Sequence, residues 1–255
     1  MLAFAAGTAL SACAQPNPSA TISAPYDPYE AENRRMHAFN VSLDRAIVRP
    51  VAKGYSDFVA DDVEQVIGNF ATNMSMPSSI VNNILQGNGR DASQDFYRMV
   101  INTTIGLGGL IDVATDMKMP PRSDADFGET LYVWGVAEGP YLELPLIGPA
   151  STRDAAGRTV DLFTNPLDYV LESPESYYGT GASGLKTLGA RGRFGDSIDS
   201  LLYDSADSYA ASRSLYLQNR RYKLGKSGTD DYLDPYDATY GGAAVSSDFE
   251  DPYDQ

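Results

Sequence analysis

Residues 61–85 read DDVEQVIGNFATNMSMPSSIVNNIL, and their apolar side chains recur every three to four positions. This spacing predicts an amphipathic α-helix, and Asp61 followed three positions later by Glu64 predicts a capping box at its start. The apolar stripe consists of Val63, Val66, Ile67, Phe70 and Met74. After Pro77 we expect a second, short helix that ends at Gly87. Its apolar residues are Ile80, Val81, Ile84 and Leu85.

Helical spacing recurs on both sides of this stretch. The folded part is expected to begin near Asp27, its first helix to end at Arg49-Pro50, and a later helix to be capped by Asp91. The apolar sets are Met36, Phe39, Leu43, Ala46 and Ile47; Phe96, Met99, Val100 and Thr103; Val160, Phe163, Leu167, Val170 and Leu171; and Phe194, Ile198, Leu201 and Leu202. No segment alternates convincingly as a half-buried strand would, so the sequence predicts an all-α fold.

One helical segment ends in a cluster of glycines. Residues 99–111 are largely apolar and would span about 20 Å as a helix, which is too short for about 30 Å of hydrocarbon. They are long enough to lie in one leaflet, where Gly106, Gly108 and Gly109 would bend the backbone. The alternative is a buried core helix that ends at these glycines.

Residues 119–152 contain five prolines and four glycines, so a long regular helix is not expected there. The segment is nevertheless apolar around Trp134 and Tyr141, and long irregular segments in compact domains are often functional. A Tyr/Trp pair beside aliphatic residues suits a membrane interface, and it suits a packed core equally well.

The N-terminal residues resemble a bacterial lipoprotein signal. The only cysteine, Cys13, follows Leu10-Ser11-Ala12 and a short apolar run. We expect residues 1–12 to be removed, Cys13 to be acylated, and residues 13–25 to form a flexible tether. Ala14 stands where an aspartate would resemble an inner-membrane retention signal, so we expect the outer membrane. Met1-Leu2 provides no basic n-region, which suggests a translation start further upstream; a fortuitous cysteine is the alternative.

The chain of 255 residues is acidic, with a net charge of −15. This balance argues against nucleic-acid binding, which needs basic surface to neutralise phosphates. About half of the excess lies in residues 226–255, where one basic residue faces eight acidic ones, and we expect a disordered tail there. Residues 26–225 are then one helical domain.

Candidate catalytic residues are few. His37 is the only histidine, so a histidine-based metal site or triad would depend on it alone. Residues 179–184 match G-x-G-x-x-G, but no apolar strand precedes them, and we interpret them as a connection between helices. Gly225-Lys226-Ser227 is not a phosphate loop, because Arg220 occupies the position of the first glycine. The sequence therefore specifies no reaction, no metal and no cofactor.

A collinear series of short motifs resembles the MlaA/VacJ family of outer-membrane lipoproteins, closely over residues 26–175 and more weakly to about 224. The series is Asp27-Pro28-Tyr29-Glu30, Asn33-Arg34, Val48-Arg49-Pro50-Val51, Gly68-Asn69-Phe70, Asn82, Leu85-Gln86-Gly87, Asn102-Thr103, Gly106, Gly109, Asp112-Val113-Ala114, Phe127-Gly128-Glu129-Thr130-Leu131, Gly135-Val136, Gly139-Pro140-Tyr141, Leu144-Pro145, Gly148 and Arg153-Asp154. Glu32 departs from the aromatic residue that the family usually places there.

The resemblance implies a membrane-embedded ring or wedge of amphipathic helices in the inner leaflet, with a long Gly/Pro-rich apolar loop and a central passage for phospholipids. It also implies a trimeric porin and a periplasmic lipid-carrier protein as partners, and removal of phospholipids from the outer leaflet to keep lipid asymmetry. Such a passage needs polar groups inside and glycines where the backbone bends within lipid. The candidate passage residues are Phe39, Asn40, Gly106, Gly108, Gly109 and Tyr141.

Two other functional classes stay open at this point. A lipid-modifying enzyme would need a Ser or Asp within hydrogen-bond reach of His37 in a cleft. A porin-associated structural adaptor would have a closed core without a polar channel.

Overall fold

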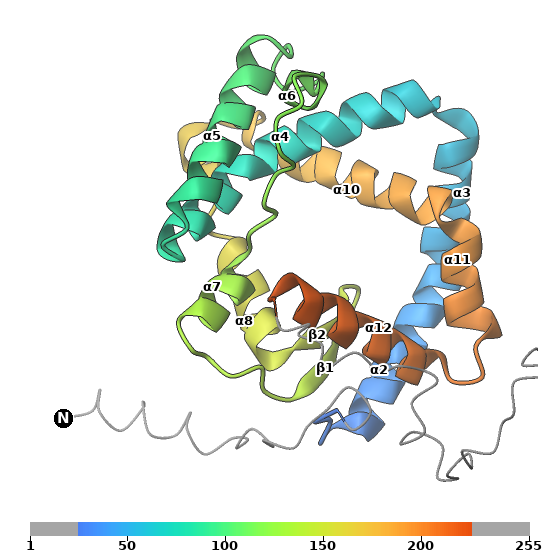
Figure 1. Ribbon diagram of the computed structural model, residues 1–255. Helices are drawn as coiled ribbons and strands as arrows, with labels where there is room; N and C mark the ends of the chain where they lie inside the picture. The colour runs from blue at the N-terminus through green and yellow to red at the C-terminus, as the bar shows by residue number, and fades with distance from the viewer. Residues whose placement is uncertain (1–24, 226–255) are drawn as a thin grey trace, which may run out of the picture.

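The computed structural model describes residues 25–225, which fold mainly into helices (Figure 1). The expected lipidation site Cys13, the tether up to residue 24 and the acidic tail lie outside the described residues. The longer helices are α2 (Glu30–Leu43), α3 (Arg49–Phe58), α4 (Asp61–Leu85), α5 (Gly89–Thr104), α8 (Thr152–Asp161), α10 (Ser176–Arg193) and α12 (Ser208–Lys223). The shorter ones are α6 (Val113–Asp116), α7 (Phe127–Val133), α9 (Leu167–Val170) and α11 (Gly195–Asp199), with π-helical turns η2 (Asp44–Val48) and η3 (Ser200–Asp204).

The elements run around a four-sided frame in Figure 1. Helix α4 packs against α5 and α10, and α10 packs in turn against α3. On the opposite side of the frame, α12 crosses a small hairpin that also contacts α2 and α8. Neighbouring elements on this side come from both ends of the sequence, so side-chain contacts across them close the frame.

Two prolines do not end helices, contrary to the sequence prediction. Helix α2 continues through η2 into α3, where the N–H of Arg49 bonds to the carbonyl of Asp44, five residues back. A π-turn of this kind shifts the hydrogen-bond pattern just before Pro50, which has no N–H of its own to donate. Pro77 is buried inside α4, which stays one helix because it packs along its length on α5 and α10.

The predicted helix caps were also wrong in detail. Helix α4 has Ala60 at its N-cap without a side-chain hydrogen bond. The Glu64 side chain is buried and forms a 3.0 Å ion pair with Arg193 of α10. Asn88, and not Asp91, caps α5 by accepting a hydrogen bond from the backbone N–H of Asp91. Glu64, which the local pattern assigned to a cap, is thus used in tertiary packing instead.

The sequence analysis missed a two-stranded antiparallel hairpin, β1 (Tyr141–Leu144) with β2 (Gly148–Ser151). In β1 the leucines Leu142 and Leu144 are partly exposed, whereas Tyr141 and the acidic Glu143 are buried, which is the reverse of the usual burial of apolar side chains. Residues 119–152 are therefore not irregular throughout, since α7 and this hairpin lie within them. The G-x-G-x-x-G match lies inside α10 and is not a connection between helices. Across residues 25–225, helices with the length and apolar content needed to cross a membrane are absent.

Candidate functional site

A cavity of about 710 Å³ lies between α2, η2, the hairpin, η3 and α12. Its volume is in the range of small-molecule and cofactor sites, which are usually apolar with a few polar groups. The apolar lining consists of Val41, Leu43, Val48, Leu146, Ile147, Pro149, Leu201, Leu202 and Leu215. The polar lining consists of His37, Asn40, Asp44, Glu143, Arg158, Ser212, Tyr216 and Asn219. The cavity is amphipathic, as a site for a lipid requires.

Asn40 is the one predicted passage residue among the described residues that line this cavity. Its amide nitrogen donates to the carbonyl of Leu144 at 2.9 Å and to Oε1 of Glu143 at 3.2 Å. Its amide oxygen accepts from the N–H of Leu146 at 2.9 Å. Asn40 therefore clamps the turn of the hairpin onto α2 and fixes this wall of the cavity.

Tyr141 lies behind the wall. Its side chain is 2% exposed, and its hydroxyl donates to Oε2 of Glu143 at 2.6 Å. Burial, together with this hydrogen bond to a carboxylate, raises the pKa of Tyr141 far above its usual value, so the hydroxyl stays protonated and donates. Phe39 lies on α2 with about half of its side chain exposed and does not line the cavity.

His37 has the hydrogen-bonding neighbours that the enzyme alternative required. Its Nε2 lies 3.1 Å from Oγ of Ser208, and its Nδ1 lies 3.3 Å from Oε1 of Glu143. His37 and Glu143 line the cavity, but Ser208 is not among its lining residues. Glu143 also accepts from Asn40 and Tyr141, so the same carboxylate holds α2, the hairpin and, through His37, the start of α12 together.

The predicted glycine bend is a separate feature beyond the end of α5. The N–H groups of Gly106 and Gly109 bond to the carbonyls of Ile101 and Asn102, and the N–H of Gly108 bonds to that of Thr103. A Cβ on Gly109 would lie 2.4 Å from Cβ of Asn73, whereas one on Gly108 would meet nothing within 4 Å. The residues that line the 710 Å³ cavity include none of these glycines.

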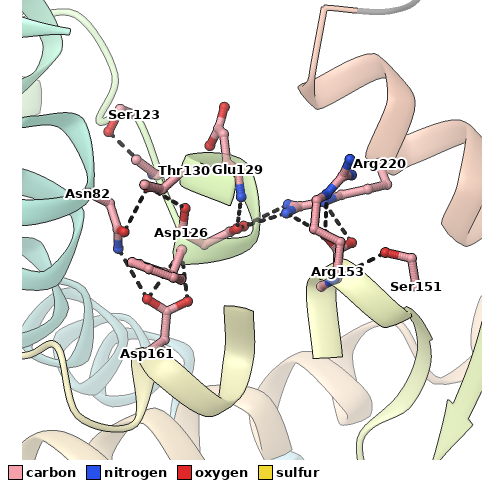
Figure 2. Close-up of polar contacts among 12 residues, drawn as sticks. Asn82, Ser123, Asp126, Glu129, Thr130, Ser151, Arg153, Asp161 and Arg220 are labelled. Atoms are coloured by element: carbon pink, nitrogen blue, oxygen red, sulfur yellow. Dashed lines mark hydrogen bonds and ion pairs between the residues drawn. The ribbon is translucent and has the colours of Figure 1, made fainter. Parts of the chain in front are cut away.

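Arg220 of α12 joins two carboxylates at the ends of α7 and α8 (Figure 2). It donates to both oxygens of Asp126 at 2.6 and 2.8 Å and to Oδ1 of Asp154 at 2.9 Å. Burial would raise the pKa of Asp126, but the hydrogen bonds and charge of Arg220 hold it below its usual value. The pKa of nearby Glu129 is raised, by burial first and then by the Asp126 charge. Arg220 thus serves as the counter-ion of both aspartates.

A smaller cavity of about 390 Å³ opens beside this ion-pair cluster. Its lining consists of Asp126, Asp154, Arg158, Tyr216, Asn219, Arg220 and Lys223. None of these residues was predicted from the sequence to line a site, although Asp154 belongs to the series of motifs that carries the family resemblance. Four of them, at positions 216, 219, 220 and 223, follow the three-to-four spacing of one helix face, so their shared side of α12 could have been found from the sequence.

Known proteins resemble this chain in both sequence and structure. Residues 25–223 match the family model described as "MlaA lipoprotein". The chain is 37% identical over 199 residues to the "Intermembrane phospholipid transport system lipoprotein MlaA" of Escherichia coli, with 77% of each chain covered. It is 31% identical to the Haemophilus influenzae protein of the same name, covering 88% of this chain and 89% of that one. A solved structure described as "Structural basis for maintenance of bacterial outer membrane lipid asymmetry" matches with a TM-score of 0.67 and 34% identity, over 78% of this chain and 98% of the other.

Proposed function

The chain belongs to the MlaA lipoprotein family, and from this premise we propose that it is an outer-membrane lipoprotein that transports phospholipids between membranes. In finer detail, it removes phospholipids mislocalised to the outer leaflet and passes them to a periplasmic carrier protein, in association with a trimeric porin. The observation that carries this proposal is the amphipathic 710 Å³ cavity, whose apolar walls suit acyl chains and whose polar groups suit a headgroup.

Exposed apolar side chains support placement in the inner leaflet. After α5, Ile105 and Leu107 are 63% and 68% exposed, and Met117 is 59% exposed. Leu110 and Ile111 lie between them and are also exposed. Exposed apolar side chains concentrated in one segment are typical of membrane or protein contacts, and for a lipid-anchored protein we infer contact with the membrane. In this proposal the glycine bend, with Gly106, Gly108 and Gly109, lies in lipid. Asn40 lines the passage, Tyr141 supports its wall from behind, and Phe39 lies on the same helix as Asn40 but outside the lining.

The test is the phospholipid content of the outer leaflet in a strain that lacks the chain and is complemented with variants. Filling the cavity with Leu215→Trp should raise outer-leaflet phospholipid while the protein stays abundant and porin-associated, because the large ring occupies the space of acyl chains. A structural adaptor has no use for the cavity, so normal asymmetry with this variant would favour the adaptor instead. Leu185→Trp is the matched control, because Leu185 is also exposed but lies on α10, outside the cavity lining.

The lipid anchor has its own test. Cys13→Ala removes the thiol that acylation needs, and we expect the variant to fractionate away from the outer membrane. A variant that stays in that membrane and restores asymmetry would show that the anchor is dispensable.

A second candidate, lipid hydrolysis, is favoured by the Ser208–His37–Glu143 arrangement. Ser208→Ala separates the two functions, because a nucleophile is essential to an acyl-enzyme mechanism and dispensable to a carrier. We expect normal lipid asymmetry with this variant and no fatty acid release from phospholipid by the purified wild-type chain.

A further inference from the structure

The two cavities described above share part of their lining. Arg158, Tyr216 and Asn219 line both the 710 Å³ cavity and the 390 Å³ cavity. Arg158 comes from the last turn of α8, and the other two come from one face of α12. An amphipathic chamber and a polar chamber therefore lie side by side, and these three side chains belong to the lining of both.

Some charged side chains of the smaller chamber form ion pairs with each other, and others do not. Its two carboxylates, Asp126 and Asp154, are both bound by Arg220, and the hydroxyl of Tyr216 donates to Asp154. Arg158 and Lys223 also line the chamber, but neither side chain forms a hydrogen bond or an ion pair with any residue between 25 and 225. Three cations thus face two carboxylates, and the two cations without partners are the ones available to a ligand.

The charge of Lys223 acts on carboxylates in and beside the chamber. The Lys223 charge helps to lower the pKa of Asp126 and opposes the rise in the pKa of Glu129. The lining of this chamber has three cations and two carboxylates, so its sign is opposite to the net charge of the chain, which is −15. The chamber is therefore a local attractor for an anionic group.

A phosphate matches these donors. An arginine guanidinium bonds phosphate oxygens with two parallel N–H groups, and a lysine ammonium adds a point charge with three donors. The amide of Asn219, which also faces both chambers, provides a further donor. The apolar lining of the adjoining chamber fits the hydrocarbon that a phospholipid carries on the same molecule.

We propose that Arg158 and Lys223 bind the phosphate of a phospholipid headgroup while its acyl chains lie in the adjoining 710 Å³ cavity. This inference rests on the proposed function and assigns its headgroup subsite. The carboxylates Asp126 and Asp154 do not repel the phosphate strongly, because Arg220 bonds to both and offsets one of their two charges, and Arg158 and Lys223 outweigh the other.

The experiment measures binding of phosphatidylglycerol in mixed detergent micelles to the purified full chain. Arg158→Gln and Lys223→Gln remove one charge each and keep side-chain length. We expect each to weaken binding about tenfold, the effect of one charge-assisted hydrogen bond, and the double variant to weaken it further. Arg35→Gln with Arg90→Gln is the charge-matched control, since both arginines are exposed and lie on α2 and α5. Equal unfolding midpoints would show that all variants fold.

Two additional arms separate the possible outcomes. Inorganic phosphate should not displace the lipid at equal concentration, because the acyl chains provide much of the affinity. If phosphate and lipid bind equally well to the wild type and the double variant binds neither, the site is one for free phosphate and the headgroup assignment is overturned. If the double variant binds lipid as the wild type does while Leu215→Trp loses binding, the subsite is wrong and the transport proposal stands. If Leu215→Trp also binds normally, the cavity itself is not the lipid site.

Discussion

The wall formed by α2, the hairpin and α12 differs from the glycine bend in how its polar groups are satisfied. In the wall, Asn40 bonds to Leu144 and His37 to Glu143, over separations of 104 and 106 residues. In the bend, most backbone hydrogen bonds of residues 101–111 join groups a few positions from each other, except at the carbonyl of Leu110, which accepts from Asn69 of α4 at 3.2 Å, and several apolar side chains are exposed. A region assembled from distant side chains keeps a fixed cavity, whereas a locally closed turn presents apolar surface. The two regions are therefore suited to different contacts with lipid, which variants can separate.

The largest effect is expected at the ion-pair cluster beside the wall. Arg220→Met keeps most of the side-chain volume but leaves Asp126 and Asp154 without their shared counter-ion. We expect a loss of about 3–5 kcal/mol in unfolding free energy, measured by urea denaturation, because an uncompensated buried carboxylate remains. The deficit should shrink in acid, where protonation of the carboxylates removes the unpaired charge. A deficit that does not change between pH 7 and pH 4 would mean that lost packing, and not charge, explains it.

Sequence reasoning predicted local features better than these distant ones. The helical segments could be predicted because apolar spacing is a local property of the sequence. Helices α4 and α5 lie where the apolar residues around Val66 and Met99 predicted them. Asn40 was found through the family resemblance. Asp154 appeared only as part of a family motif, and its pairing with Arg220 was not predicted, because a contact over 66 residues depends on how α12 and α8 are placed in the fold. The helix ends predicted at Pro50 and Pro77 were wrong, because a π-turn and tertiary packing accommodate these prolines within continuous helices.

Within the bend, the two glycines distinguish packing from a role in lipid passage. Gly109→Ala places Cβ against Asn73 and keeps a φ of +92°, so we expect a loss of about 2–4 kcal/mol and lower abundance of the protein. Gly108→Ala meets no neighbouring atom and carries only the strain of a φ of +76°, about 1–2 kcal/mol. Denaturation midpoints and protein abundance in cells measure both effects.

The Gly108 variant also tests whether the bend acts in transport. If the bend is a flexible wall of the passage, Gly108→Ala should impair lipid asymmetry at nearly normal abundance. If lipid asymmetry is normal with Gly108→Ala and the protein loses abundance with Gly109→Ala, the bend is only a packed helix end. The passage would then be confined to the region of Asn40.

The smallest effect is expected at the start of α12, the helix that carries the cavity residues on one face. Asp207 accepts a hydrogen bond from the N–H of Ala210 and forms a two-pronged ion pair with Arg34, at 2.8 and 3.0 Å. The hydrogen bonds from Arg34 and from the backbone lower the pKa of Asp207 to about 2. Because the pKa is lowered in the folded protein, the stabilisation is complete above the unfolded value and is lost as the pH falls through about 2.

Two substitutions at Asp207 separate the cap from the ion pair. Asp207→Asn keeps an oxygen that can cap the helix and removes the charge, so it should cost at most about 1 kcal/mol, since Asp207 and Arg34 are each more than 40% exposed. Asp207→Ala also removes the cap and should cost about 1 kcal/mol more. Urea denaturation at pH 7 in low and high salt measures the difference, and only the ion-pair part should diminish with salt. Equal losses for the two variants would assign the whole contribution to the ion pair, and the start of α12 would then depend on α2 as directly as the cavity wall does.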